Sequence, residues 1–269
     1  MGILNVTPDS FFDGGRYSGD LPSRQRVDEL IAEGAGIIDI GGESTRPGAE
    51  PVPAREQIRR IEAPVAHAVA RGVRVSVDTT DPEVAEHALG LGAQIINDVS
   101  CLANPDLALV VARQGATLIL MHCRESMSQM AGFSQYPEDG YDDVVEDVRR
   151  EWRRARDRAI ELGVDAENIW FDPGLGFQKS ARHSMQLLSR LDAFQSEGVP
   201  IVVGASRKSF IALIDEAPPN ERLGGSIAAC ILARKLGASV LRVHDVRATL
   251  QALRLTVAAE AARAGAQHA

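Results

Sequence analysis

Cysteine is scarce in this chain, and long apolar runs are absent. The three cysteines, Cys101, Cys123 and Cys230, are scattered and lack Cys-x-x-Cys spacing, which excludes a disulfide framework and suits a reducing cytoplasm. No uninterrupted apolar stretch reaches the ~20 residues of a membrane-spanning helix. Met1 leads straight into a strand-like run without the architecture of a signal peptide. We therefore expect a soluble, cytoplasmic protein with no membrane partner.

An excess of positive charge is also lacking. The chain has 29 lysines and arginines against 37 aspartates and glutamates, a formal net charge of -8. It has no basic run and no basic patch interleaved with aromatics, so we expect no nucleic-acid partner. Any cationic cluster must therefore be local. Linkers and low-complexity tracts are missing as well, so residues 1–269 are expected to form a single domain.

A cycle of apolar run, loop, amphipathic helix and glycine recurs along the chain. The apolar runs lie at residues 3–4, 37–40, 73–77, 94–96, 117–121, 169–171, 201–203 and 240–243. The glycines before the second and later runs are Gly34, Gly72, Gly92, Gly115, Gly163, Gly198 and Gly237, as expected at helix ends. Continuous apolar runs fit parallel strands that are buried on both faces. Eight strand–helix units predict an α/β fold, a single (β/α)8 TIM barrel. A doubly wound open sheet is the alternative, but it rarely runs to eight units with none left over.

The segments between the runs give further signals. Asp81-Pro82-Glu83 and Asn104-Pro105-Asp106 each place a capping side chain before a proline, which we expect at the first helical position. The longest stretches without periodicity, 7–22, 41–53 and 122–140, each follow a predicted strand. We therefore expect these three stretches to lie on one rim of the barrel.

Every predicted strand ends in a hydrogen-bonding side chain. These residues are Asn5, Asp39, Asp78, Asn97, His122, Asp172, Ser206 with Lys208, and Arg242 with His244. Any one of them alone is explained equally well as a solvated strand end. All eight strand ends together indicate a site, because they converge on one mouth of the barrel and an apolar barrel core does not require them.

The residue types at this mouth suit two kinds of ligand. The side chains that suit the donor edge of a flat, nitrogen-rich heterocycle are Asp78, Asn97 and Asp172. The cations that suit phosphate or carboxylate are Arg46, Arg242, His244 and Lys208. Asn5 offers a neutral oxygen to Mg²⁺, which often binds through one or two protein oxygens and substrate phosphates. The turn at 206–208 is expected to open a short helix whose backbone N–H groups favour another anion.

A series of longer motifs covers nearly the whole chain. They are MGILNVTPDSF (1–11), GGESTRPG (41–48), VDT (77–79), INDV (96–99), MH (121–122), DPGLGF (172–177), SRKS (206–209) and RVHDV (242–246). Together, and in this order, they closely resemble the dihydropteroate synthases of bacterial folate synthesis. The set is highly specific, whereas any one of these motifs alone is not.

The resemblance implies a transferase that acts on two small molecules. Such an enzyme joins p-aminobenzoate to 6-hydroxymethyl-7,8-dihydropterin diphosphate with Mg²⁺, forming 7,8-dihydropteroate and releasing diphosphate. The implied reaction is a dissociative substitution, for which we assign no general base because an aniline-type nitrogen is neutral at pH 7. The loops at 7–22 and 41–53 are hypothesised to order over the diphosphate.

The resemblance also implies a role for individual residues. The pterin pocket would contain Asp78, Asn97, Met121, Asp172 and Lys208. The diphosphate would be held by Asn5, Arg46, Arg242 and His244, with Mg²⁺ on Asn5. The aminobenzoate would contact Phe11, Thr45, Pro47, Phe177, Ser206 and Lys208, with its carboxylate towards Ser206. The residues implied in catalysis are Lys208, Asp172, Arg242 and His244.

Some positions depart from the family pattern. The chain begins at its first strand, whereas relatives often carry an N-terminal extension. Phe12 stands where many relatives have a small polar residue, and we hypothesise that its ring alters discrimination against sulfonamides, which mimic p-aminobenzoate. The loop at 123–136 also differs, which leaves its contacts to the pterin open.

Several histidines are expected to have no functional role. Adjacent side chains on a strand point to opposite faces, so His122-Cys123 is expected to be a rim histidine beside a cysteine rather than a zinc site. His67, His87 and His183 fall within or at the ends of predicted helices, so we expect them at the surface.

Two alternative functions remain from the sequence. A pterin-binding methyltransferase barrel serving a corrinoid partner would share the pterin-pocket residues, and a non-catalytic pterin-binding module would keep Asp78 and Asp172. The methyltransferase has no evident need for Ser206-Arg207-Lys208 beside Arg242 and His244, and the non-catalytic module could lose the diphosphate ligands, which are all present here. Apolar helix stripes at 227–232 and 246–257 favour a homodimer, although burial against the barrel explains the same pattern.

Overall fold

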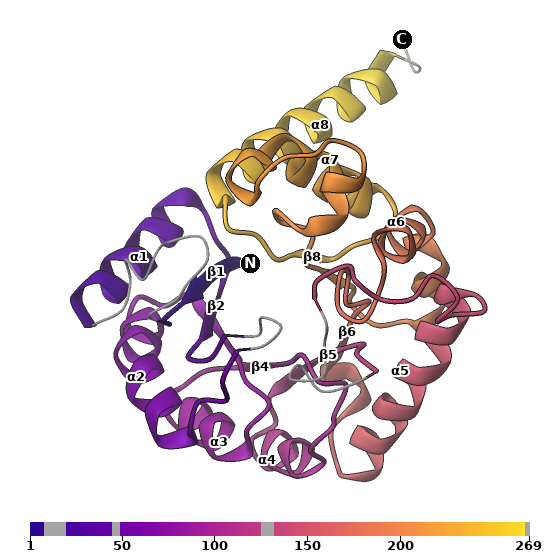
Figure 1. Ribbon diagram of the computed structural model, residues 1–269. Coiled ribbons are helices and arrows are strands. Elements are labelled where there is room, and N and C mark those ends of the chain that lie inside the picture. The colour runs from indigo at the N-terminus through magenta and orange to yellow at the C-terminus, as the bar shows by residue number, and fades with distance from the viewer. Residues whose placement is uncertain (8–19, 45–48, 125–131, 267–269) are drawn as a thin grey trace.

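The computed structural model describes residues 1–7, 20–44, 49–124 and 132–266. In these ranges strands and helices alternate along the chain (Figure 1). The strands are β1 (Gly2–Asn5), β2 (Ile37–Gly41), β3 (Arg74–Asp78), β4 (Ile95–Asp98), β5 (Thr117–Met121), β6 (Ile169–Asp172), β7 (Val202–Val203) and β8 (Val240–Leu241). The α-helices are α1 (Asp20–Glu33), α2 (Ala54–Ala70), α3 (Pro82–Gly90), α4 (Asp106–Gln114), α5 (Val144–Glu161), α6 (Ala181–Ser189), α7 (Leu223–Lys235) and α8 (Val246–Ala266). Short 3-10 helices are η2 (Ala166–Asn168), η3 (Leu191–Glu197), η4 (Ser209–Leu213) and η5 (Pro219–Glu221).

The strands close into a barrel. Strands β1 to β6 pair in sequence order, all parallel, and β7 pairs with β8. Two parallel bridges complete the circle, Phe171 with Ile201 between β6 and β7, and Gly2 with Val243 after β8. The chain direction and the surrounding helices follow the (β/α)8 pattern (Figure 1). The predicted TIM barrel is therefore confirmed, and the open-sheet alternative is excluded.

Most of the predicted helix ends are also confirmed. All seven glycines predicted to end helices have positive φ, from 62° at Gly115 to 103° at Gly237. Asp81 caps α3, since its Oδ1 accepts from the Glu83 backbone N–H at 2.8 Å. At α4 the prediction is off by one residue: Pro105 is the N-cap itself, while Asn104 Oδ1 accepts from the Asp106 N–H at 3.1 Å.

The barrel interior has an apolar floor below a polar mouth. Ile37, Ile95, Ile119 and Val202 cluster there, and Trp170 and Val240 pack against them. Successive side chains of a strand alternate between its two faces, so a residue two positions after a floor residue also points into the barrel. The residues two positions after the floor residues are Asp39, Asn97, Met121, Gly204, Asp172 and Arg242. We name Asp39, Asp78, Asn97, Met121, Asp172 and Arg242 the mouth residues. The polar side chains of the mouth residues therefore point into the barrel, at the end where the sequence predicts a site.

Helix α8 departs from the ring of helices. Its first turns pack on the barrel through Val246 and Thr249, which are buried, and its later turns project away from the ring (Figure 1). On the projecting part, Leu255 is 72% exposed and Val257 46% exposed. The barrel therefore does not cover this part of the apolar stripe. Within the described ranges, we find no helix that combines the length and apolarity needed to span a bilayer.

Candidate active site

Arg242 links three strands at the mouth of the barrel. Its Nε donates to Asp39 Oδ2 at 2.6 Å, and its Nη2 donates to Asp78 Oδ2 at 2.8 Å. Asp39 is fully buried and also accepts from Ser76 Oγ at 2.6 Å and from Asn97 Nδ2 at 3.4 Å. Sequence reasoning placed Asp39 at the mouth but assigned it no ligand or partner, although an acid inside the apolar run of β2 was the available signal. The structure shows it as the anchor of the arginine.

Two buried carboxyls face the mouth from β3 and β6. Burial raises the pKa of Asp78 to about 7, against the opposing effect of the Arg242 guanidinium. Burial also raises the pKa of Asp172, and here the charge of Lys208 is the main opposing effect. Asp172 Oδ1 accepts from the Gly174 N–H at 2.7 Å, which fixes its orientation. A ligand that donates N–H bonds to these carboxyls would favour their charged forms.

Lys208 lies beside Phe177, as predicted for residues that share a ligand. Its ammonium is 4.5 Å from the centroid of the Phe177 ring and donates to the Leu175 carbonyl. Burial lowers the pKa of Lys208 to about 7, although Asp172 opposes the effect. The amine is therefore poised between its charged and neutral forms near neutral pH.

An apolar wall completes this side of the mouth. Met121 and Phe177 belong to one buried cluster with Val99 and Cys123. The ring of Phe133 meets Phe177 edge-on, with 5.4 Å between centroids. Such a wall suits the flat face of an aromatic ligand. Sequence reasoning did not find Val99 or Phe133, because apolar residues near a strand end carry no chemical signal of their own.

The residues after β7 and β8 contact each other. The Ser206 hydroxyl lies 3.0 Å from His244 Nδ1 and accepts from the His244 backbone N–H at 3.3 Å. Burial and the nearby Arg242 charge lower the pKa of His244 to about 3. The ring is therefore neutral at pH 7, which corrects its grouping with the cations. It can bind an anion as a neutral hydrogen-bonding group.

The turn at 206–208 differs from its prediction in two respects. Arg207 adopts φ 59° and pairs with Asp245, with its Nε 2.7 Å from Oδ2, so its charge is engaged within the protein. The expected helix is η4, a 3-10 helix of 5 residues, too short to provide a strong anion site at its N-terminus.

Known proteins resemble this chain over nearly its whole length. A family model described as "Pterin binding enzyme" matches residues 1–244. The dihydropteroate synthase of Escherichia coli strain K12 is 41% identical over 265 residues, covering 98% of this chain and 92% of that protein. The chain belongs to the dihydropteroate synthase family.

Solved structures of dihydropteroate synthases match the fold. One is the Yersinia pestis dihydropteroate synthase with a sulfonamide drug complex, at a TM-score of 0.90 and 36% identity, covering 97% of this chain and 93% of that one. Another is the Xanthomonas albilineans dihydropteroate synthase with 4-aminobenzoic acid, at a TM-score of 0.85 and 41% identity, covering 97% and 92%. The barrel thus follows the dihydropteroate synthase fold.

Part of the site predicted from the dihydropteroate synthase motifs lies outside the described residues. These residues are Phe11, Thr45, Arg46 and Pro47, together with Phe12. Their roles stay predictions, as does the lid role of the loops that contain them. The hypothesis about Phe12 is tested by comparing sulfonamide inhibition constants of the wild type and Phe12→Ser, since equal constants would refute it.

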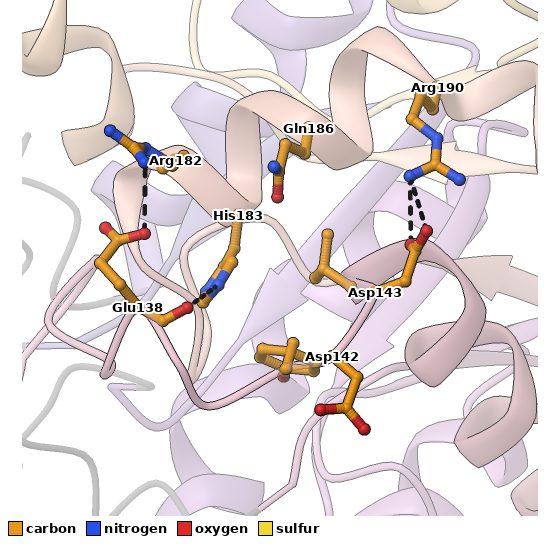
Figure 2. Close-up of a pocket in the computed structure, with 9 residues that line it drawn as sticks. Glu138, Asp142, Asp143, Arg182, His183, Gln186 and Arg190 are labelled. Carbon is orange, nitrogen blue, oxygen red and sulfur yellow. Dashed lines mark hydrogen bonds and ion pairs between the residues drawn. The ribbon is translucent and has the colours of Figure 1, made fainter.

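Two histidine predictions were wrong. His122 is not on the rim: its side chain is fully buried and its Nε2 lies 2.9 Å from Glu151 Oε2 of α5. His183 is 4% exposed, because it shares a capping box with Ser180 at the start of α6 and its Nε2 contacts the Glu138 carbonyl at 3.1 Å. Figure 2 shows the His183 ring pointing at Glu138 in a pocket bounded by α6 and the start of α5. His67 and His87 are half-buried.

Proposed function

We propose that this chain catalyses the dihydropteroate synthase reaction of folate biosynthesis. It transfers the pterinylmethyl group of 6-hydroxymethyl-7,8-dihydropterin diphosphate to the amine of p-aminobenzoate, giving 7,8-dihydropteroate and diphosphate. The observation that carries the proposal is the gathering of buried acids, an amide and cations at one mouth, on a chain that matches dihydropteroate synthases over nearly its whole length. The methyltransferase and non-catalytic alternatives have no observation in their favour.

The pterin binds among Asp78, Asn97, Asp172, Met121 and Lys208. The two carboxyls and the amide are buried, so hydrogen bonds to the N–H donors of a pterin form away from competing water. Met121 supplies an apolar surface for the ring. Binding of the donor edge favours the carboxylate forms of the acids, which prepares them for positive charge on the pterin.

The diphosphate binds at Arg242, His244 and Asn5, with Arg46 from the outer loop. Asp39 and Asp78 engage Nε and Nη2 of Arg242, while Nη1 makes no hydrogen bond within the described part of the chain. One nitrogen of a firmly held guanidinium is thus directed to the substrate. A preorganised donor of this kind contributes ~3 kcal/mol to stabilisation of the leaving anion.

Asn5 is the residue we propose for Mg²⁺. Gly41 beside it has no side chain, and a Cβ there would lie 3.6 Å from Asn5 Oδ1 and 3.5 Å from Asp78 Cβ. The space next to the amide oxygen is therefore open. One neutral oxygen fits a cation whose other ligands are diphosphate oxygens and water. When bound, the metal neutralises charge on the leaving diphosphate.

The reaction is a dissociative substitution. The bond between the methylene carbon and the diphosphate oxygen breaks, and its electron pair remains on diphosphate, where Arg242 stabilises the charge. Asp172, which faces the ring, stabilises the cation on the pterin. The neutral amine of p-aminobenzoate attacks the methylene carbon and then loses a proton, so we assign no general base.

The p-aminobenzoate binds between Phe177, Lys208 and Ser206, with Phe11, Thr45 and Pro47 from the outer loops. The Lys208 ammonium beside the Phe177 ring places an apolar face and a cation next to each other. An aromatic carboxylate needs both. The hydroxyl of Ser206 is buried at the same end of β7, which supports its role at the carboxylate.

We also propose a homodimer that uses α7 and α8. Leu232 on α7 is 38% exposed, and Leu255 and Val257 on α8 are exposed as well. A second copy of the chain would cover these side chains. Cys101, Cys123 and Cys230 form no disulfide in the part of the chain that the structure describes, which supports the proposed cytoplasmic location.

The central experiment measures diphosphate release. The protein is incubated with pterin diphosphate, p-aminobenzoate and Mg²⁺, and release is expected only when both substrates are present. Chelation of the metal with EDTA is expected to lower the rate. An absence of release at saturating substrates would overturn the proposed function.

A further inference from the structure

Lysine is rare in this chain, and one lysine is fully buried outside the predicted site. Among 29 basic residues only Lys179, Lys208 and Lys235 are lysines. Lys235 lies on α7 with a side chain that is 53% exposed. Lys179 is 0% exposed and lies in the loop between β6 and α6, two residues after Phe177. A buried charge needs partners to offset its desolvation.

The partners of Lys179 are all neutral acceptors. Its Nζ lies 3.0 Å from the Phe177 carbonyl, 3.3 Å from the His122 carbonyl and 3.0 Å from His122 Nδ1. These contacts use the three donors of an ammonium. Lys179 forms no ion pair within 4.0 Å among the residues that the structure describes. Its hydrogen bonds therefore fix backbone carbonyls rather than balance a neighbouring carboxylate.

His122 connects Lys179 to a charged group on α5. Its Nδ1 accepts from the ammonium, so the ring proton is on Nε2 and is donated to Glu151 Oε2 at 2.9 Å. Glu151 is held in turn by Arg124, whose Nη2 lies 2.7 Å from Oε1. Burial and the Lys179 charge lower the pKa of His122 to about 4, consistent with this neutral tautomer. A chain of hydrogen bonds thus runs from the buried ammonium through a neutral ring to a carboxylate on α5.

The loop is also fixed on its outer side. Tyr141 donates to the Gln178 carbonyl at 3.0 Å, and the rings of Tyr141 and His183 meet edge-on at 5.0 Å. Figure 2 shows the His183 side chain directed at Glu138. These contacts hold residues 178–183 but do not reach Phe177. The Phe177 N–H donates to the Gly174 carbonyl at 3.1 Å, and the Phe177 carbonyl is held from the inner side by Lys179.

Lys179 packs directly beneath the turn that leads to Phe177. A Cβ on Gly174 would lie 3.3 Å from Lys179 Nζ and 2.2 Å from the His122 carbonyl oxygen. On the opposite side, Lys208 donates to the Leu175 carbonyl. Two lysines thus hold carbonyls two residues apart in the same turn. Lys208 faces the mouth, and Lys179 faces the barrel wall.

We propose that Lys179 is a positioning residue that sets the Phe177 ring for p-aminobenzoate. The proposal rests on the proposed function and deepens it. Without the ammonium, the Phe177 and His122 carbonyls lose a shared donor inside the protein, and the turn relaxes. A displacement of about 1 Å in a substrate-positioning group can cost about 100-fold in rate. Because Phe177 is assigned to p-aminobenzoate and not to the pterin, we expect the larger effect on p-aminobenzoate.

The test uses Lys179→Met, which removes the donors and keeps an unbranched side chain of similar length. Steady-state diphosphate release is measured while each substrate is varied in turn. We expect the KM for p-aminobenzoate to rise about 10-fold or more, and the KM for pterin diphosphate to change less than about twofold. A purely structural role would lower the active fraction, and with it kcat, without altering either KM. The matched control is Lys235→Met, for which we expect both KM values to be unchanged.

The outcomes separate this proposal from the proposed function. If the wild type releases no diphosphate, the function fails. If the wild type turns over and Lys179→Met keeps the wild-type KM for p-aminobenzoate, the positioning role is refuted. Should Lys179→Met not fold, Lys179→Gln retains two donors, and we expect it to fold with an intermediate KM. A wild-type KM for p-aminobenzoate in Lys179→Gln would likewise overturn the proposal.

Discussion

Arg242 Nε lies 2.6 Å from Asp39 Oδ2, a contact between residues 203 positions apart in the sequence. The pair brings the middle of β2 next to the residue that follows β8. Because Asp39 is buried and also bonded to Ser76, the guanidinium is fixed before any substrate arrives. The guanidinium that we propose for the diphosphate is therefore held by side chains of the barrel strands.

Replacing Asp39 is expected to weaken diphosphate binding. Asp39→Asn removes the charge that holds Nε of Arg242, and a hydrogen bond to a charged group contributes about 1.5–3 kcal/mol. We expect kcat/KM for pterin diphosphate to fall roughly 10- to 100-fold. Ser76→Ala removes the other short contact to Asp39, and we expect it to lower kcat/KM for pterin diphosphate much less. Equal kinetics for Asp39→Asn and the wild type would contradict the anchoring role.

Two glycines with the same backbone conformation should respond differently to alanine. Gly174 has φ 67° and Gly198 has φ 69°, but a Cβ on Gly174 would meet the His122 carbonyl oxygen at 2.2 Å, whereas nothing lies within 4 Å of one on Gly198. Gly198→Ala should cost only the conformational penalty of about 1–2 kcal/mol. Gly174→Ala should cost several kcal/mol more or prevent folding. Urea unfolding of both variants measures the difference, and equal losses would mean that the turn adapts to a side chain.

Affinity for p-aminobenzoate should depend on the protonation of Lys208. The pKa of this amine is about 7 in the substrate-free protein, below its ordinary value of 10.5. A bound carboxylate favours the ammonium and raises the pKa, so binding above pH 7 takes up a proton. We expect the affinity to be constant below pH 7 and to fall by up to about tenfold per pH unit above it. Calorimetric titration between pH 6 and 9 measures this dependence, and Lys208→Met should show a weaker but flat profile. A flat profile in the wild type would refute the idea.

Acid should destabilise the protein through His122. Its pKa is about 4 in the folded chain, below the ordinary 6.5, so between these values the unfolded state binds a proton that the folded state does not. The free energy of unfolding therefore falls as pH drops from 6.5 towards 4, by up to about 1.4 kcal/mol per pH unit. The pKa of Glu151 is about 2 in the folded chain, below the ordinary 4.5. Protonation of this carboxyl in the unfolded state therefore lowers the free energy of unfolding further below pH 4.5.

Substitution of His122 isolates its contribution. His122→Asn keeps an acceptor for Lys179 but removes the titrating ring, so its unfolding free energy should change less between pH 6.5 and 4.5 than that of the wild type. Urea denaturation at half-unit pH steps gives the comparison. Parallel curves for the two proteins would show that His122 does not titrate between folded and unfolded states.

A charged residue on the exposed part of α8 tests the proposed dimer. Leu255→Glu places a carboxylate on the projecting part of the helix, where Leu255 is 72% exposed, and should shift the protein from dimer to monomer in sedimentation velocity. Leu109→Glu on α4, across the ring from α8 (Figure 1), is the control and should leave the mass unchanged. A monomeric wild type at micromolar concentration would overturn the proposal.

Much of the fold and part of the site could be predicted from the sequence. Periodic apolar runs and glycines at helix ends specify eight strand–helix units, because these signals depend on local backbone preferences. Polar residues such as Asp78, Asn97 and Asp172 stand out because an apolar strand gains nothing from them. Their common face follows from the two-residue period of a strand.

The partners of these residues were decided by the tertiary structure alone. No local pattern links Asp39 to Arg242, His122 to Glu151, or Lys179 to the Phe177 carbonyl, since closure of the barrel brings together residues far apart in the chain. The pKa values of Lys208 and His244 follow from burial, which the folded chain creates. The sequence by itself determined which chemical groups stand at the strand ends. Only the tertiary structure decided which of them are charged, which are paired and which can meet a substrate, because desolvation and long-range contacts arise on folding.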